Sequence, residues 1–245
     1  ISSGELGEIT NYRGRFFSMY GSDPLGLLSW RFKLDEGGHG ATSDLLSHAV
    51  DLAHMLLGPI TRVVGTTATF IGDRPLPVPG HGTHYGRGAA GDPTGAVTNE
   101  DYAGMLCEFA SGARGTFEAS RTIVGPESQM AFDVYGTQGA VGWNLERLNE
   151  LRLYRLTTDR GSGYTTVFGG ERFPYHGSFV PGSANGIGFE DLVAIEDLEF
   201  CRSVAEGRPH APGFAEAVDY VSVQAALLRS VRSGRWEPVV SLREE

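Results

Sequence analysis

Hydrophobic and polar residues alternate along several short segments of the chain, and this period of two predicts β-strands. The predicted strands cover residues 7–20, 61–71, 101–110, 113–122, 128–135, 140–146 and 148–156. Residues 61–71 are rich in β-branched side chains, and a turn at Ser111 and Gly112 joins two strands in the pattern of a hairpin. The later strands follow one another with short turns, so the pattern predicts an antiparallel meander.

A second, helical pattern covers residues 37–60, which are apolar on nearly every side. Thr42 or Ser43 is expected to cap its start, and Gly58 with Pro59 to end it. Two further helices are predicted at residues 189–206 and 214–233, and long loops at residues 72–99 and 157–188.

The order of these elements predicts an α+β fold: an open, predominantly antiparallel β-sheet with a few helices packed on one face. So few helices cannot cover both faces of the sheet. We therefore expect an exposed apolar face that joins copies of the chain into a homodimer or homotetramer.

The composition of the chain argues against some classes of binding partner. The 245 residues include 20 Lys and Arg against 30 Asp and Glu, a formal net charge of -10, which argues against a nucleic-acid partner. No apolar run is long enough to span a membrane, and no signal peptide is visible. Cys107 and Cys201 form no disulfide framework, which favours a cytoplasmic protein. Cys107 alternates with Met105 and Phe109, as a buried core thiol would.

The helix at residues 37–60 carries Asp44, His48 and Asp51 within two turns, about 60° of one another around its axis. Three interpretations are open. The first is structural, with Asp44 bonding first-turn amides and His48 bonding a neighbouring carboxylate. The second is a metal site that adds His39 and His54, although no familiar metal motif fits. The third is general acid–base chemistry.

One glycine-rich stretch matches a nucleotide-binding pattern in its letters only. Residues 86–91 read GRGAAG, which fits G-x-G-x-x-G. A dinucleotide fingerprint needs a strand before it and a helix after it, and neither is predicted here. We therefore interpret these glycines as part of a loop.

The segment around the polar stripe resembles the signature of the Gfo/Idh/MocA oxidoreductases, and it reads WRFKLDEGGHGATSDLLSHAVDLAHMLLG. In that family a glycine-rich turn leads into a helix with the pattern Asp-x-x-x-His-x-x-Asp, which Asp44, His48 and Asp51 match. The segments SGELGEI, FASGARGTFEASR and VYGTQGAVGWN also resemble family segments. SWRF, NLERLNEL and GIG are most similar to dehydrogenases of anhydrosugars such as levoglucosan, followed by inositol and sugar dehydrogenases.

The resemblance implies an NAD- or NADP-dependent dehydrogenase that transfers hydride between a nicotinamide and a secondary hydroxyl of a sugar, anhydrosugar or cyclic polyol. It implies catalytic roles for two residues, with His48 as the base and Asp44 orienting the hydroxyl or the imidazole ring. The substrate-binding candidates are Trp30, Arg31, Asp51, Tyr175, His176 and Asn185.

Two features of the family are missing from this sequence: the N-terminal Rossmann domain and the Glu-Lys-Pro motif. His39 also stands where the family commonly has a glycine. Residues 1–245 are therefore expected to form the substrate-binding and oligomerisation domain, with the cofactor held mainly by a domain absent from this chain and the fragment alone inactive. A metal-dependent enzyme and a non-catalytic dimerising scaffold are the alternatives.

Overall fold

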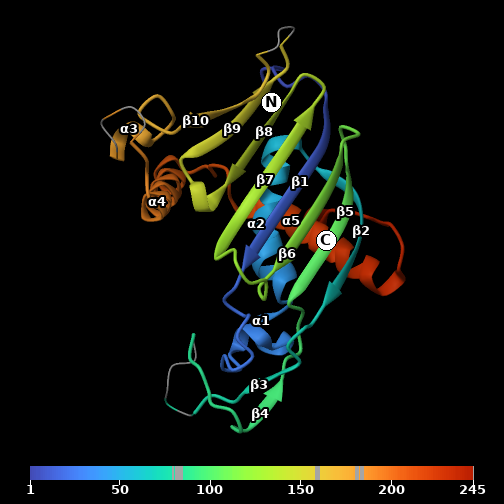
Figure 1. Ribbon diagram of the computed structural model, residues 1–245. Coiled ribbons are helices and arrows are strands. Elements are labelled where there is room, and N and C mark those ends of the chain that lie inside the picture. The colour runs from blue at the N-terminus through green and yellow to red at the C-terminus, as the bar shows by residue number, and fades with distance from the viewer. Residues whose placement is uncertain (79, 81–84, 158–160, 180–181, 183–184, 245) are drawn as a thin grey trace.

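The computed structural model describes residues 1–245 except 79, 81–84, 158–160, 180–181, 183–184 and 245. In this part of the chain a nine-stranded sheet has the order β10-β9-β8-β7-β1-β6-β5-β2-β11 (Figure 1). Its strands are β1 (Ile9–Ser18), β2 (Ile60–Ala68), β5 (Tyr102–Phe109), β6 (Arg114–Ser120), β7 (Ser128–Gly136), β8 (Gly139–Asn144), β9 (Glu150–Arg155), β10 (Tyr164–Phe168) and β11 (Glu237–Pro238). All seven predicted strands are confirmed, and six of them are shorter than predicted by one to four residues.

The described helices are α1 (Leu34–Gly37), α2 (Ala41–Leu57), α3 (His176–Phe179), α4 (Phe189–Glu206) and α5 (Phe214–Ser233), with 3-10 turns η1 (Trp30–Phe32), η2 (Leu145–Arg147) and η3 (Leu242–Glu244). The predicted bounds of α4 and α5 agree with the structure at every end. A glycine flanks each end of both helices and so marks where the helix begins or stops. The helix predicted at 37–60 is confirmed with narrower bounds as α2, which ends at Gly58 in a positive-φ conformation.

The predicted meander of the later strands is interrupted, because β1 lies between β6 and β7 in the strand order. β1 pairs antiparallel with β7 and parallel with β6, in a register that runs from Asn11–Arg114 to Phe17–Ser120. The sheet is therefore mixed, although the mostly antiparallel sheet with few helices is confirmed. A parallel pair needs a long crossover, and here the chain between β1 and β6 contains α2 and two further strands of the sheet.

α2 and α5 cover one face of the sheet, behind the strands in Figure 1. The core lies between this helical layer and the inward side chains of the strands. Tyr12 is at its centre: its ring packs against Phe109, Phe117 and Phe132, with centroids 5.3 to 6.3 Å away. Burial of several aromatic side chains in one cluster supplies much of the hydrophobic stabilisation of a sheet–helix core.

Alternation along β5 separates the two faces of the sheet. Ala103, Met105, Cys107 and Phe109 are buried under the helices, whereas Leu106, between them, is 50% exposed on the other face. The prediction of a buried thiol is thus confirmed, and burial raises the pKa of Cys107 to about 12. Cys107 is therefore an inert core residue.

Among the described helices none covers the other face of the central strands, as predicted, but its side chains are not only apolar. On β7 and its neighbours Asp133 accepts hydrogen bonds from Arg15 at 3.1 Å and from Arg152 at 2.8 Å. Next to Leu106, Glu108 on β5 lies within ion-pair distance of Arg62 on β2. The open face therefore combines exposed apolar residues with paired charges.

The two predicted loops contain short elements of their own. Residues 72–99 include the two-stranded sheet of β3 (Asp73–Pro75) and β4 (Thr94–Ala96), and residues 157–188 include β10 and α3. The glycine-rich residues 86–91 lie between β3 and β4 with no helix after them, where Arg87 pairs with Asp23 at 2.7 Å. Their interpretation as loop glycines is confirmed.

α4 lies beside α3 at the β10 side of the sheet (Figure 1) and has no buried side chain. Its apolar residues Phe200 and Val204 are each 68% exposed. The apolar side of this helix is therefore not used by the core of the described chain. Among the described helices none is long and apolar enough to cross a membrane.

Close packing of α5 on β2 depends on Gly65. An added methyl group there would overlap the carbonyl oxygen of Gly104 and the side chain of Leu227 on α5. We expect Gly65→Ala to lower the free energy of unfolding by about 1–3 kcal/mol, the usual cost of overpacking a core. Chemical denaturation measures this. Gly72→Ala is the control, since no atom lies within 4 Å of the added methyl; equal effects of both variants would contradict the account.

Candidate active site

The start of α2 is held by a residue distant in sequence. Glu100 accepts the amide of Ala41 on its backbone oxygen at 3.0 Å and the amide of Thr42 on its side chain at 2.9 Å. Thr42 and Ser43 lie inside the first turn, and neither caps it. The prediction that one of them caps the helix is therefore wrong. Gly40, just before the helix, has no room for a side chain, because a methyl group would overlap Glu100 and Arg121.

A buried ion pair lies directly beneath this turn. Asp101 and Arg121 are both fully buried, with Arg121 Nε donating to Asp101 Oδ1 at 2.8 Å. Arg121 Nη1 also donates to the backbone oxygen of Arg31 at 2.8 Å, and Asn99 donates to the same oxygen at 3.0 Å. The ion pair thereby fixes the turn η1, which carries Trp30 and Arg31, beside the first turn of α2.

Asp44 is the first functional side chain of α2. Its Oδ2 accepts a hydrogen bond from the hydroxyl of Tyr20 at 2.9 Å and another from Arg31 Nη1 at 3.2 Å. The guanidinium of Arg31 also lies 4.7 Å above the ring of Trp30, which is 48% exposed. Of the predicted residues, the structure brings Trp30, Arg31 and Asp44 together.

These residues border a small cavity of about 170 Å³. It is lined by both apolar and polar groups, from Trp30, Arg31, Gly37, His39, Gly40, Ser43, Asp44 and Arg121. His39 Nδ1 lies 3.4 Å from the Glu100 carboxylate. A cavity with a carboxylate, a guanidinium, a hydroxyl and an exposed indole ring can hold a small hydroxylated molecule.

His48 lies one helical turn after Asp44, on the same side of α2, and its side chain is exposed. Its ring meets the ring of Phe16 edge-on at 5.6 Å. Within the described part of the chain it makes no hydrogen bond to Asp44 or Asp51. The structural interpretation of the stripe, in which a carboxylate satisfies His48, therefore does not describe this protein.

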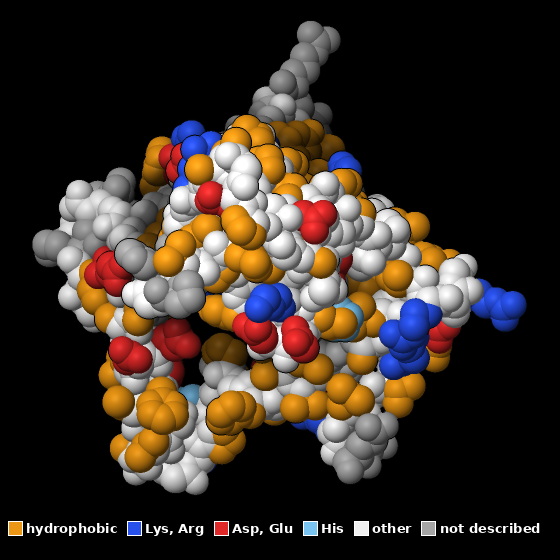
Figure 2. All heavy atoms as spheres, turned by 90° about the horizontal axis from the view of Figure 1, so that it is seen from below, with side chains coloured by type: hydrophobic (Ala, Val, Ile, Leu, Met, Phe, Trp, Pro, Cys, Tyr) orange, Lys and Arg blue, Asp and Glu red, His pale blue; other side chains and the backbone are white. Residues whose placement is uncertain are grey.

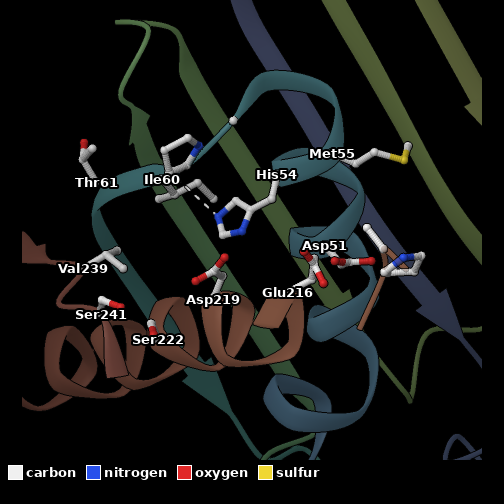
Figure 3. A pocket seen from close by; sticks show the side chains of 14 residues that line it. Asp51, His54, Met55, Ile60, Thr61, Glu216, Asp219, Ser222, Val239 and Ser241 are labelled. Atoms are coloured by element: carbon white, nitrogen blue, oxygen red, sulfur yellow. Dashed lines mark hydrogen bonds between the residues drawn. The ribbon is translucent and has the colours of Figure 1, made fainter. Parts of the chain in front are cut away.

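Asp51 borders a different and larger cavity, of about 730 Å³, between α2, α5 and the C-terminal segment (Figure 3). There its carboxylate lies next to that of Glu216 (Figure 3). Burial, and then the charge of Glu216, raise the pKa of Asp51, while His48 opposes them. The structure therefore does not place Asp51 beside Trp30, Arg31 and Asp44.

His54 points into the same larger cavity (Figure 3). Its Nε2 accepts the amide of Ile60 at 3.3 Å, and burial lowers its pKa, so it holds the neutral form. Asp219 across the cavity pairs with Arg243. Among the described residues no group of three or more His, Cys, Asp or Glu is arranged to hold a metal ion.

The three candidate substrate-binding residues from the predicted loop 157–188 lie away from both cavities. Tyr175 donates to Glu199 of α4 at 2.8 Å, and His176 Nδ1 accepts the amide of Gly170 at 3.2 Å. Asn185 is exposed. None of the three lines either cavity. Viewed from the end where β3, β4 and α1 lie, the surface is hollowed on the side of α3 and α4 (Figure 2).

The sequence did not identify Tyr20, Arg121, Glu100 or Asp101 as part of the site. For the first two a signal was present in the alternation of inward and outward residues along the strands. Arg121 continues the buried alternation of Phe117 and Ala119 beyond the end of β6, and Tyr20 continues the inward positions of β1. A charged side chain at an inward position is costly to bury without a partner, so Arg121 indicates a buried ion pair.

The open sheet with helices on one face places this chain in the α+β class, with a small cavity at the start of a core helix. A family model described as the GFO/IDH/MocA C-terminal domain matches residues 1–142. The chain belongs to this family, as its resemblance predicted. Levoglucosan dehydrogenase of Pseudarthrobacter phenanthrenivorans is 33% identical over 244 residues, which make up 98% of this chain and 62% of that protein.

Solved structures of relatives are similar to this chain over nearly its whole length. Levoglucosan dehydrogenase in complex with NADH and levoglucosan superposes with a TM-score of 0.88 at 29% identity, over 98% of this chain and 61% of that one. An NAD binding oxidoreductase from Klebsiella pneumoniae gives a TM-score of 0.88 at 30% identity, with the same coverage of 98% and 61%. This chain thus spans less than two thirds of the length of these relatives.

The environment of Asp51 predicts how stability depends on pH. Its folded-state pKa is raised, so the charged form opposes folding at every pH above that value, and the penalty fades as pH falls toward the unfolded-state pKa of about 4. We expect Asp51→Asn to raise the melting temperature at pH 7 and to leave it unchanged near pH 4. Asp219→Asn, which loses the pair with Arg243, should give no gain. A lower melting temperature for Asp51→Asn at pH 7 would refute this assignment.

Proposed function

We propose that this chain is the substrate-binding and catalytic part of an NAD-dependent dehydrogenase that oxidises a secondary hydroxyl of a sugar, anhydrosugar or cyclic polyol. The observation that carries the proposal is the placement of Asp44 and His48 one turn apart on the exposed side of α2, with Trp30 and Arg31 beside Asp44. The similarity to levoglucosan dehydrogenase supports an anhydrosugar or related sugar as the substrate class.

In this proposal His48 accepts the proton of the substrate hydroxyl at a ring nitrogen. An imidazole is the side chain best suited to proton transfer near neutral pH, and the exposed ring of His48 has no described hydrogen-bond partner that would block it. Asp44 accepts a hydrogen bond from a substrate hydroxyl and so orients the reacting carbon. The exposed ring of Trp30 offers an apolar surface for the C–H face of a sugar.

NAD, when bound, supplies the hydride acceptor. The described residues do not form a nucleotide-binding fingerprint, since the glycine-rich residues 86–91 lie in a loop without a following helix. We therefore propose that residues 1–245 form the substrate-binding and oligomerisation domain and that a separate nucleotide-binding domain holds the rest of the cofactor.

We further propose that a second copy of the chain covers the sheet face that α2 and α5 leave open. Half-exposed Leu106 and aromatic residues such as Tyr135 lie there among complementary Arg and Glu side chains. A face with both apolar area and paired charges suits a self-complementary, two-fold interface.

His48→Ala tests the proposed base. In the full-length protein we expect kcat for sugar oxidation to fall by about 10²-fold to 10⁴-fold, the usual contribution of a positioned general base. Because the side chain is exposed, the melting temperature should change little, and NAD binding should persist. Single-turnover hydride transfer, NAD titration and thermal melting measure the three quantities.

The control is His54→Ala on the same helix. His54 is partly buried and accepts a backbone hydrogen bond, so this variant should lose stability yet keep its turnover per folded molecule. If His48→Ala instead melts early and turns over normally when folded, His48 has a structural role and the proposed mechanism is wrong.

Leu106→Asp tests the interface. Because Leu106 is 50% exposed on the open face, the charge should not unfold the monomer but should disfavour a contact between copies. Sedimentation is expected to show a dimer or tetramer for the wild type and a monomer for the variant. Val240→Asp, at a similarly exposed apolar residue beyond β11, should leave the assembly intact. A monomeric wild type at high concentration would overturn the proposal.

A further inference from the structure

The carboxylate of Asp44 is held on one oxygen only. Tyr20 and Arg31 both donate to Oδ2, at 2.9 and 3.2 Å, and no described residue donates to Oδ1. The two donors come from different segments, the end of β1 and the turn η1. Two hydrogen bonds on one oxygen fix the rotation of a carboxylate and leave its second oxygen directed elsewhere.

We infer that Tyr20 and Arg31 are positioning residues that orient Asp44 so that Oδ1 alone meets the substrate hydroxyl. This inference rests on the proposed function, in which Asp44 binds that hydroxyl. It differs from the prediction made from the sequence, where Arg31 was a substrate-binding residue and Tyr20 had no role.

Tyr20 is suited to this task because it is fixed and stays protonated. Its ring packs between the main core and the smaller cluster of Leu28, Phe32 and Val97. Burial, and then the negative charge of Asp44, raise the pKa of the Tyr20 hydroxyl. The phenol therefore remains an O–H donor throughout the range of enzyme activity, and its rigid ring sets the position of the bond.

Arg31 is held from both ends. Its backbone oxygen accepts hydrogen bonds from Arg121 and Asn99, and its guanidinium lies over the ring of Trp30. The hydrogen bond to Asp44 restrains the side chain further. A guanidinium and a phenol both donate to the same oxygen, so two hydrogen bonds from different segments hold the Asp44 carboxylate.

Tyr20→Phe tests the inference with a matched control. Tyr12→Phe removes the hydroxyl of another buried tyrosine, one that has no hydrogen-bond partner in the described structure and lies in the core. We expect Tyr20→Phe to change the ¹³C chemical shift of the Asp44 carboxyl, because one of its two hydrogen-bond donors is lost, and to lower kcat by about tenfold with little change in KM. Tyr12→Phe should change neither quantity.

Arg31→Met separates positioning from substrate binding. If Arg31 positions Asp44, this variant changes the ¹³C chemical shift of the Asp44 carboxyl and lowers kcat, as Tyr20→Phe does. A rise in KM with unchanged kcat and an unchanged Asp44 signal would show that Arg31 binds substrate, and would overturn the inference for this residue. An Asp44 signal that does not move in Tyr20→Phe would overturn it for Tyr20.

The ¹³C chemical shift of the Asp44 carboxyl is measured without turnover, so the positioning role and the proposed function can fail separately. A wild-type protein that oxidises no sugar or polyol would refute the proposed function, while the change in the Asp44 signal would still decide whether Tyr20 and Arg31 hold that carboxylate. A changed signal with unchanged kcat in an active enzyme would refute the role of this orientation in the reaction.

Discussion

The geometry of the candidate site depends on the buried ion pair between Asp101 and Arg121. Both side chains are fully buried, and breaking such a pair by removing one partner costs about 3–5 kcal/mol, because the other charge is left unpaired. Their remaining hydrogen-bonding groups are also satisfied. Asp101 Oδ2 accepts the amides of Phe70 and Ile71, and Arg121 Nη2 donates to Asn99 Oδ1.

This network joins four segments that are distant in sequence: the end of β6, the start of β5, the chain after β2, and the turn η1. Through the backbone oxygen of Arg31 it fixes η1, and through Glu100 it fixes the first turn of α2. Asp44 and Arg31 can therefore meet at 3.2 Å without either side chain being buried. Exposed polar residues keep a defined geometry here because the backbone beneath them is rigid.

The local sequence pattern was sufficient to predict the helices and strands. It was not sufficient to predict which elements lie beside one another. α4 and α5 are bounded by glycines, and the strands by their period of two, so both were predictable from neighbouring residues. The parallel pairing of β1 with β6 was not, since alternation defines the faces of a strand but not which strand lies beside it. Capping of α2 by Glu100 is likewise a contact across 58 residues of sequence.

The arrangement of the polar residues on α2 was also not predictable from local pattern alone. Helical spacing placed Asp44, His48 and Asp51 on one side, but Asp44 borders the small cavity at the start of α2, Asp51 borders the larger cavity shared with α5, and His48 lines neither. The family resemblance identified the helix, whereas the partners of each carboxylate, Tyr20 and Arg31 for one and Glu216 for the other, required the fold.

The central proposal is that substrate binds beside Asp44 and His48 rather than in the larger cavity. Titrating the protein with levoglucosan and following the ring signals of Trp30, His48 and His54 by NMR tests it most directly. The account predicts shifts at Trp30 and His48 and none at His54, which lines the larger cavity on the same helix. Shifts centred on His54, with Trp30 and His48 unchanged, would contradict it.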